Sequence, residues 1–305
     1  IGFYVVATLA SPILPIYPYE QQVISHQNLP PSIHAAGQVM LKARTAYMKQ
    51  VVESEGRTGF NDEEKAQIAS MEKDIQTNPE HKRIYLLGTD ALGRDMLSRI
   101  LYGGRISIMI GLVGTITAVL VGVIVGSISG YVGGKLDDLI MRFVDIMYSL
   151  PYMLVVIIMM ALFGKNIINL FIAIALVSWL TLCRVVRGQI ISLKNAEFVE
   201  AARSMGAGTS RIIFRHLTPN TVGIIVVFST LMLPQFIMSE SFLSFLGLGV
   251  SAPMASWGSL VSEGANVMEL YPWQLLGPAL AMTLFLFAMN FLGDGLRAAL
   301  DPQSK

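Results

Sequence analysis

Charged residues and cysteine are both scarce in this 305-residue sequence. Asp, Glu, Lys and Arg make up 14% of it, against about 25% in soluble globular domains. Apolar residues make up 53%. This imbalance excludes an ordinary soluble domain and indicates a polytopic membrane protein. The single cysteine, Cys183, excludes a disulfide framework within the chain and a cysteine-based zinc site. The four histidines are scattered along the sequence and predict no metal site.

Catalytic and nucleotide-binding motifs are also missing. The sequence contains no phosphate-binding loop, no GxSxG nucleophile motif and no HExxH zinc motif, so we expect neither an enzyme nor a chain that binds a cofactor itself. The apolar runs hold ionisable residues only near their ends, whereas an ion-coupled carrier usually places carboxylates at mid-membrane. The net charge of +1 gives no indication of nucleic-acid binding. Energy for transport is therefore expected to come from a partner.

Apolar runs predict six membrane spans. Residues 1–16 are interpreted as a truncated first transmembrane helix, with a cleavable signal peptide as the alternative. A transmembrane domain over 106–300 follows, with runs near the roughly 20 residues that a span needs. Its five spans are expected at about 106–130, 144–164, 166–187, 217–240 and 270–293. A further run, 241–262, is dense in Gly, Ser and Pro and is expected to be re-entrant or interfacial.

Glycines in the second predicted span favour close helix packing, although glycine is also common in membrane helices generally. The residues concerned are Gly111, Gly114, Gly122, Gly126 and Gly130.

The distribution of basic residues predicts the topology. Segments 131–142, 184–216 and 294–305 together hold ten Lys and Arg residues, whereas the alternate segments 164–170 and 240–276 hold one. Because positive charge marks the cytoplasmic side, the first three segments are predicted to lie inside. Residues 17–105 are then an extracytoplasmic loop, and both termini are inside.

The loop 17–105 is predicted to contain an inserted helical hairpin at about 33–78. Apolar residues recur at helical spacing in each half, and Asn61 and Glu64 form the pattern of a capping box. The narrow apolar stripes predict packing against each other or against a partner. The sequence LGTDALGRDMLSR at 87–99 is interpreted as a turn leading into an interfacial helix; its two aspartates lack the spacing of a calcium loop.

A charged, helix-forming stretch at 195–220 separates two of the predicted spans. Asn195 is the expected N-cap, and acidic residues at Glu197 and Glu200 suit the first turn of a helix. Gly206 and Gly208 are expected to end that helix. The small side chains of Ala201 and Ala202 would let a partner approach the backbone closely. The stretch is therefore interpreted as a docking helix at the membrane surface, with a solvated loop as the alternative.

The path of a transported solute has a weaker signature. Glu240 is an acidic residue set between two apolar runs, so it is interpreted either as a pathway residue or as an interfacial carboxylate bonded to Ser239 or Ser241. Methionine adapts to varied shapes, although at helical spacing it is more often a core residue. The further pathway candidates are Gln235, Met232, Met238 and Met153.

Several motifs in order resemble the C-type transmembrane permease subunit of bacterial oligopeptide and dipeptide ABC importers. They are LGTDALGRDMLSR (87–99), GGK (133–135), VSW (177–179), RVVRGQ (184–189), EAA (200–202) with Gly206 and LTP (217–219), ESFLSFLGLG (240–249), NFLGDGLR (290–297) and LDP (300–302). The outer loop is longer than is usual in this family, and the hairpin at 33–78 has no counterpart in this pattern.

The resemblance implies an all-α, six-span type I importer permease in the bacterial inner membrane. Its EAA loop, here at 190–219, would form the cytoplasmic coupling helix. The coupling residues carried over are Glu197, Glu200, Ala201, Ala202, Arg203, Gly206, Arg211 and Pro219. Expected partners are a homologous second permease subunit, two cytoplasmic ATPases that hold ATP and Mg, an extracytoplasmic solute-binding protein, a peptide substrate and the lipid bilayer. The alternatives are import of nickel or another small solute, and a structural or regulatory subunit that acts through its outer hairpin.

Overall fold

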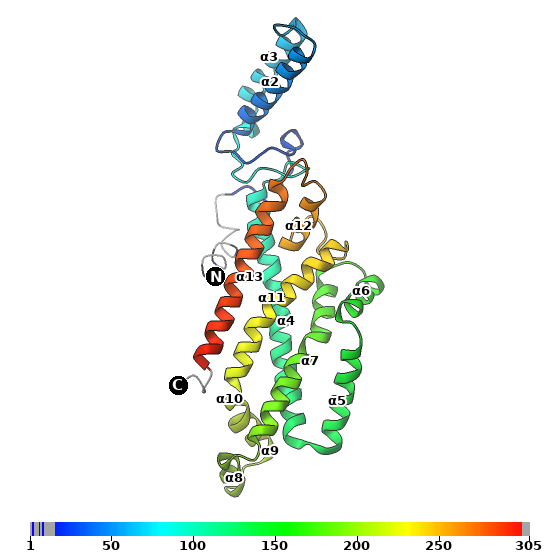
Figure 1. Cartoon of the computed structure of the whole chain (residues 1–305), viewed down its shortest axis with the longest axis vertical. Helices are drawn as coiled ribbons and strands as arrows, with labels where there is room; N and C mark the ends of the chain where they lie inside the picture. Colours follow the sequence, from blue (N-terminus) through cyan, green and yellow to red (C-terminus); the bar gives the residue numbers. More distant parts are fainter. Residues whose placement is uncertain (1, 3–5, 7, 9–15, 301–305) are drawn as a thin grey trace. The chain divides into compact units, whose positions relative to one another are not determined.

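The computed structural model describes residues 2, 6, 8 and 16–300 (Figure 1). The expected first span, 1–16, therefore lies almost entirely outside the described residues. Helices dominate the described chain, where β pairing is limited to the isolated bridges Ala35–Ile84 and Thr89–Asp95. The predicted all-α fold class is confirmed.

The chain divides into two compact units, which are described separately here. The bundle unit contains Arg105–Ala252 and the chain from Met282 onward, and the hairpin unit contains Val6–Gly104 and Pro253–Ala281. Two long helices contribute residues to both units.

The bundle unit holds the helices that suit a membrane. In chain order its elements are α4 (Met96–Val132), α5 (Gly134–Ser149), α6 (Tyr152–Phe163), α7 (Ile167–Leu193), α8 (Glu197–Ser204), α9 (Thr209–Arg211), the π-helical η3 (Ile212–Leu217), α10 (Thr218–Asn220), α11 (Val222–Phe245) and α13 (Trp273–Leu300). Within the described residues, α4, α7, α11 and α13 are long and apolar enough to cross a membrane, and the bent pair α5–α6 makes five if it is one span. The predicted sixth span is the one at 1–16.

A bend of 79° separates α5 from α6 (Figure 1). Pro151 disfavours a helical conformation at the residue before it, and Leu150 is accordingly extended, with φ −84° and ψ 127°. The span predicted at about 144–164 therefore contains a bend and is not one straight helix. The stretch 131–142, expected as a short connection, is mostly the first half of α5.

Glycines on α4 allow the close helix packing that their spacing predicted. A Cβ added at Gly122, Gly126 or Gly130 would lie within 2.8 Å of a carbonyl oxygen of α7. At Gly126 the oxygen is that of Cys183, at 2.5 Å. The backbones of α4 and α7 thus touch along two helical turns, as small residues permit in membrane helices. An ion pair of Asp137 on α5 with Arg187 on α7, at 2.5 Å, ties a third helix to this contact.

The hairpin unit combines the long loop with the segment around α12. Its elements are η1 (Ile24–His26), α2 (Ala36–Ser54), α3 (Asp62–Thr77), η2 (Pro79–Lys82), α12 (Trp257–Ala265) and the first turns of α4 and α13. α2 and α3 pack against each other, with a Cβ at Gly37 lying only 2.7 Å from Ile75. The predicted capping box opens α3, because Asn61 Oδ1 accepts from the Glu64 N–H at 2.7 Å and Glu64 accepts from the Asn61 N–H at 2.8 Å.

The segment 87–99 is held together by a buried cluster of charges. The Asp90 carboxylate accepts from Arg94 Nε at 2.6 Å and from Arg99 Nη1 at 2.7 Å. Arg99 also pairs with Glu263 of α12 at 2.8 Å. The Asp95 carboxylate accepts from the Ser98 N–H at 3.1 Å and thereby caps α4, which begins at Met96. The turn therefore leads directly into the 37-residue helix α4, with no separate interfacial helix.

Candidate functional sites

The helix predicted within 195–220 is α8, and its start differs from the sequence-based expectation. The N-cap is Ala196, which has no side-chain capping bond, and the side chain of Asn195 does not cap the helix. Glu197 and Glu200 lie in the first turn as expected, where negative charge favours the helix dipole. The acidic first turn therefore compensates for the missing side-chain cap.

The C-terminal end of α8 is closed by the predicted Gly206. This residue has φ +81°, a conformation that glycine adopts without strain. The Gly206 N–H donates to the Arg203 carbonyl, and the Ala207 N–H donates to the Ala202 carbonyl, both at 3.0 Å. These two bonds form a Schellman motif, which fixes the direction in which the chain leaves α8. Gly208, also expected to end the helix, has an ordinary φ of −72° and caps α9 instead.

One face of α8 is locked onto the bundle unit. Val199 and Ala202 are 0% and 1% exposed, and Val199 belongs to a cluster with residues of α7, η3 and α11. Ala202 thus faces its own chain, which corrects the expectation that it lies open to a partner. The buried members of the cluster are Leu182, Val186, Ile190, Val199, Ile212, Leu217 and Ile225.

A second apolar strip on α8 is open to solvent. Phe198 is 39% exposed, Met205 is 80% exposed, and Ala201 is also exposed. A helix turns by about 100° per residue, so these three side chains lie beside one another, between the buried face and the charged face. The charged face carries Glu197, Glu200 and Ser204. α8 therefore buries half of its apolar surface within this chain and presents the other half outward.

The chain between α8 and α11 is an almost unbroken series of short helices. Arg211 ends α9, the π-helix η3 follows, and Pro219 lies in the first turn of α10. Arg211 and Pro219 are exposed, whereas Ile212, Ile213 and Leu217 are buried. Arg203 lies 5.9 Å above the ring of Tyr131 on α4. The whole segment 194–221, called the α8 segment below, is thus attached to α4, α7 and α11.

The pathway candidates separate into two groups. Met232 and Gln235 line a hollow of about 300 Å³ beside the α5–α6 bend, whereas Met153, Met238 and Glu240 do not line it. The remaining lining residues are Met147, Tyr148, Leu150, Pro151, Tyr152, Val177, Ser178, Leu180, Thr181, Phe236 and Ser239. Sequence reasoning missed the contributions of α5, α6 and α7. Pro151 within an apolar run was the signal that could have located the bend.

Glu240 is buried inside the bundle unit. Its side chain is 0% exposed, and its Oε1 accepts a hydrogen bond from the Ser244 hydroxyl at 2.7 Å. The hydroxyls of Ser239 and Ser241 bond to carbonyls of their own helix instead. The expected partners of Glu240 were therefore wrong, although the expected type of bond, from a serine hydroxyl to the carboxylate, is present.

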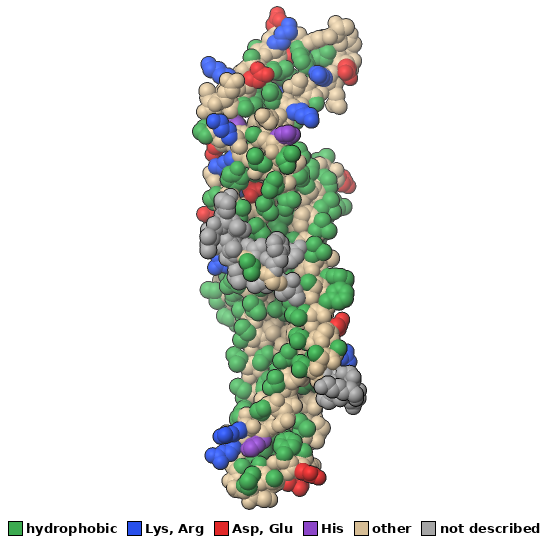
Figure 2. All heavy atoms as spheres, turned by 90° about the vertical axis from the view of Figure 1, so that its left-hand side faces the viewer, with side chains coloured by type: hydrophobic (Ala, Val, Ile, Leu, Met, Phe, Trp, Pro, Cys, Tyr) green, Lys and Arg blue, Asp and Glu red, His purple; other side chains and the backbone are tan. Residues whose placement is uncertain are grey.

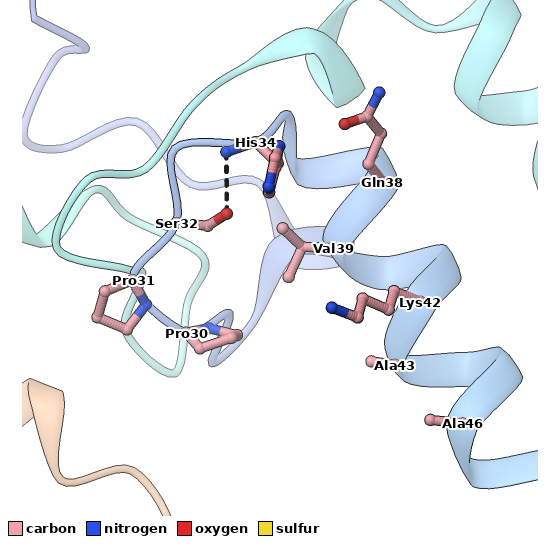
Figure 3. A pocket seen from close by; sticks show the side chains of 9 residues that line it. All are labelled: Pro30, Pro31, Ser32, His34, Gln38, Val39, Lys42, Ala43 and Ala46. Carbon is pink, nitrogen blue, oxygen red and sulfur yellow. Dashed lines mark hydrogen bonds between the residues drawn. The ribbon is translucent and has the colours of Figure 1, made fainter.

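A hollow of about 560 Å³ in the hairpin unit lies at the start of α2 (Figure 3). Pro30 and Pro31 form one side, and Val39, Lys42 and Ala43 of α2 form the other. The turn between them is fixed by a bond from the His34 N–H to the Ser32 hydroxyl at 2.9 Å. Lys42 is the single Lys, Arg, Asp or Glu among its lining residues, so the lining defines no particular ligand.

A series of hydrogen bonds links η1, η2 and the C-terminal part of α3. His26 bonds through Nδ1 to the Tyr85 hydroxyl at 2.9 Å and through Nε2 to His81 Nδ1 at 2.8 Å; His81 Nε2 bonds to Asp74 at 3.0 Å. All three bonds are satisfied with both rings neutral when protons point from Tyr85 toward Asp74. Burial lowers the pKa of His26 to about 4, and electrostatic repulsion from His81, when it is protonated, and from Arg83 adds to this effect. No residue pattern predicts this contact, because the two histidines are 55 residues apart.

Large apolar side chains cover the outside of the bundle unit. On α13, Leu284, Phe287 and Phe291 are each more than half exposed, and Figure 2 shows apolar side chains along this side of the molecule. Charged side chains gather near the α8 segment instead (Figure 2). An apolar surface of this extent suits lipid or another membrane subunit rather than water.

A family model of binding-protein-dependent transport system inner membrane components matches residues 118–305. The chain belongs to this family. It is thus a multi-pass component of the bacterial inner membrane, as the apolar spans and exposed apolar faces of the bundle unit also indicate. The matched range contains the C-terminal part of α4 and every later helix of the described chain, including the α8 segment.

Curated relatives of this inner membrane component are named as peptide permeases. The oligopeptide transport system permease protein OppC of Escherichia coli (strain K12) is 51% identical over 231 residues, covering 76% of each chain. The OppC protein of Bacillus subtilis (strain 168) is 47% identical over 71% of each chain. The dipeptide transport system permease protein DppC of the same organism is 46% identical, covering 71% of this chain and 68% of that protein.

The fold of this chain is similar to that of a solved structure. An inward-facing crystal structure of the MetNI methionine ABC transporter matches with a TM-score of 0.56. The match covers 68% of this chain and 98% of that chain, at 17% identity. At this identity the likeness shows the fold, which is that of an ABC importer permease.

Proposed function

We propose that this chain is a membrane subunit of an ATP-driven peptide importer and that its α8 segment is the coupling element. The relatives named above are oligopeptide and dipeptide permeases at 46–51% identity, which supports peptide as the solute. ATP and Mg belong to separate ATPase subunits, because the sequence has no phosphate-binding loop. A homologous second permease subunit completes the pathway, and a solute-binding protein delivers the peptide.

The observation that carries the proposal is the divided apolar surface of α8. Val199 and Ala202 bind α8 to the bundle, while Phe198, Ala201 and Met205 remain open. An exposed apolar strip on a short, capped helix is a typical contact for a partner protein. The basic residues of 184–216 support a cytoplasmic position for this helix, where it could meet an ATPase subunit.

Coupling follows from the way α8 is attached. The Schellman motif at Gly206 holds the exit from α8, and the shared cluster joins Val199 to Ile212, Leu217 and Ile225. A partner that pushes on α8 therefore moves the end of α11 with it, since close-packed side chains transmit displacement. α11 carries Met232 and Gln235 into the hollow beside the α5–α6 bend. Closure of the ATPases would thus reach the pathway and alternate its access between the two sides.

The remaining coupling residues have supporting roles. Glu197 and Glu200 lie in the first turn of α8, and Arg203 lies over Tyr131, so these charges orient the helix. Arg211 and Pro219 are exposed at the two ends of the path to α11. We propose that they contact the partner at the border of the interface.

Uptake by the assembled transporter tests the proposal. The complex of both permease subunits, the ATPases and the binding protein is reconstituted in liposomes, and ATP-dependent entry of labelled trialanine is measured. Ala201→Arg places a charge in the centre of the open strip, where an unpaired buried charge costs at least about 3 kcal/mol. We expect uptake and ATPase association to fall at least about tenfold.

The matched control is Ser204→Arg, which puts the same side chain on the charged face of the same helix. We expect it to keep uptake within about twofold of the unmodified complex, as for exposed substitutions in general. Normal uptake with Ala201→Arg, in a complex that still contains the ATPases, would contradict coupling through α8. No uptake of any peptide by the unmodified complex would contradict the proposed solute.

A further inference from the structure

The α5–α6 bend creates a break in the helical backbone within the bundle unit. α5 ends at Ser149, Leu150 is extended, and α6 restarts at Tyr152 at an angle of 79°. Irregular backbone at membrane depth is tolerated only where it is buried in protein or lines a cavity. In membrane transporters, broken helices often form the substrate site for this reason. Here the broken residues, Leu150, Pro151 and Tyr152, line the hollow described above.

The hollow has a closed inner wall and an open rim. The wall is formed by buried side chains, which are Val177, Ser178 and Leu180 of α7 and Met232 and Phe236 of α11. Tyr148, Leu150, Thr181 and Gln235 are exposed at the rim. A volume of about 300 Å³ lies at the lower end of the range for small-ligand sites, about 300–1,000 Å³. The space is therefore suited to a small group that enters from one side.

The chemistry of the lining selects an uncharged, apolar group. None of the lining residues is charged. Arg184, which lies 4.0 Å above the ring of the rim residue Tyr148, is already paired with Asp145 at 2.6 Å. A carboxylate or ammonium group would find no counter-charge in the hollow and would lose its hydration, which is costly. Aliphatic, thioether and aromatic groups would instead contact methionine and aromatic side chains, which adapt to varied shapes.

Polar groups at the edge offer bonds to a peptide unit. The Gln235 side chain is exposed at the rim. The Tyr152 hydroxyl is buried, and it faces Ser239 without a hydrogen bond of normal geometry to any described residue. A carbonyl or N–H of a bound molecule would offer this hydroxyl a better-aligned partner than Ser239 does. The Tyr148 hydroxyl, by contrast, is bonded to Thr181 at 2.5 Å.

We propose that this hollow is a side-chain subsite on the translocation path, where an apolar side chain of the peptide binds during transport. The inference rests on the proposed peptide transport and goes beyond it, because it assigns a position and a preference. Gln235 and Tyr152 hold the adjoining peptide unit, and the Met232–Phe236 wall contacts the side chain. Because the site accepts apolar groups of many shapes, it binds loosely enough to release its occupant.

The test compares peptides of one length and charge in the reconstituted complex. ATP-dependent uptake of trialanine, Ala-Leu-Ala and Ala-Phe-Ala is measured with saturating, peptide-loaded binding protein. Gln235→Trp fills the rim of the hollow from an exposed position, so the fold is little affected. We expect the Ala-Phe-Ala to trialanine uptake ratio to fall about tenfold, the size of discrimination that an altered apolar pocket provides. Leu176→Trp, an exposed change on α7 outside the hollow, should leave the ratio within about twofold.

A binding measurement supplements the uptake test. Cys183 is buried, so Gln235→Cys introduces an accessible thiol whose maleimide labelling reports on the rim. Peptide-loaded binding protein carrying Ala-Phe-Ala should slow this labelling more than the same protein carrying trialanine, with no such difference at Leu176→Cys. An unchanged uptake ratio together with equal labelling would overturn the subsite, and it would point to lipid or the second permease subunit as the occupant. Trialanine uptake by the unmodified complex would still support peptide transport in that case.

Discussion

The α8 segment and the α2–α3 hairpin are both amphipathic helical segments outside the predicted spans, yet they use their apolar side chains differently. In the hairpin, α2 and α3 pack on each other, with Gly37 against Ile75. The connection is held by the capping box and by an Arg57–Glu64 ion pair at 2.8 Å. In the α8 segment, one apolar face enters the core of the bundle and another remains open.

This difference indicates which segment needs a partner. The hairpin covers much of its own apolar surface, because Met48 and Val52 of α2 are buried and the large apolar side chains of α3 are partly buried. In the α8 segment, the side chains of Phe198, Ala201 and Met205 are exposed to solvent. The helix itself is only eight residues long. A helix of that length is marginal by itself, so the bundle must support it, and the open strip is available for docking. The structural role proposed for the outer hairpin as an alternative is thus less well supported than the coupling role of α8.

The largest expected effect comes from breaking the support under the α8 segment. In Gly126→Leu the new Cβ would meet the Cys183 carbonyl at 2.5 Å, and such overpacking costs typically about 1–3 kcal/mol. Because the obstacle is backbone, we expect the upper end of that range, measured as a lower thermal unfolding midpoint of the purified subunit in detergent. Gly188→Leu on α7, where a Cβ would meet nothing within 4 Å, is the matched control. Equal midpoints for the two variants would show that α4 and α7 are not packed as described.

A smaller effect is expected from acid, and it should be confined to the hairpin unit. The pKa of His26 in the folded protein, about 4, lies below its usual value of 6.5. The unfolded segment therefore binds more protons between these values, and stability rises with pH there. The full contribution is present above about pH 6.5, and about 2 kcal/mol is lost by the time the pH has fallen to 5.

Proteolysis of the hairpin at two pH values measures this effect. Cleavage within 55–61, relative to His26→Gln at the same pH, should increase between pH 7 and pH 5 in the unmodified protein. The variant has no imidazole to protonate at this position. Its cleavage rate should therefore change with pH only as much as the activity of the protease itself changes. Identical ratios at both pH values would mean that His26 titrates normally and that the bond to His81 does not form.

The sequence was sufficient for features that depend on local chemistry. The capping box at Asn61 and Glu64, the glycine at the end of α8 and the glycine spacing on α4 were all identified correctly from residue type and interval. These features need only neighbours within one helix, or a small side chain at a regular spacing. The family resemblance then supplied the class of transporter.

The remaining features depend on contacts that sequence spacing does not show. Helical periodicity alone did not tell which of Ala201 and Ala202 faces the bundle, because both lie at the boundary of the apolar face. Glu240 was paired with adjacent serines, whereas a helix brings the residue four positions on, Ser244, within reach. The bend at Pro151 was passed over because the run around it is uniformly apolar. Its consequence, a hollow shared by four helices, appears only when α5, α6, α7 and α11 are placed together.

Protection of thiols on α8 tests the central claim most directly. Met205→Cys lies on the open strip and Ser204→Cys on the charged face of the same helix, and both side chains are exposed in this chain. Maleimide labelling of each is compared between the permease subunits alone and the complete complex with its ATPases. The account predicts strong protection of position 205 and little change at position 204. Equal labelling of position 205 with and without bound ATPases would contradict docking through α8.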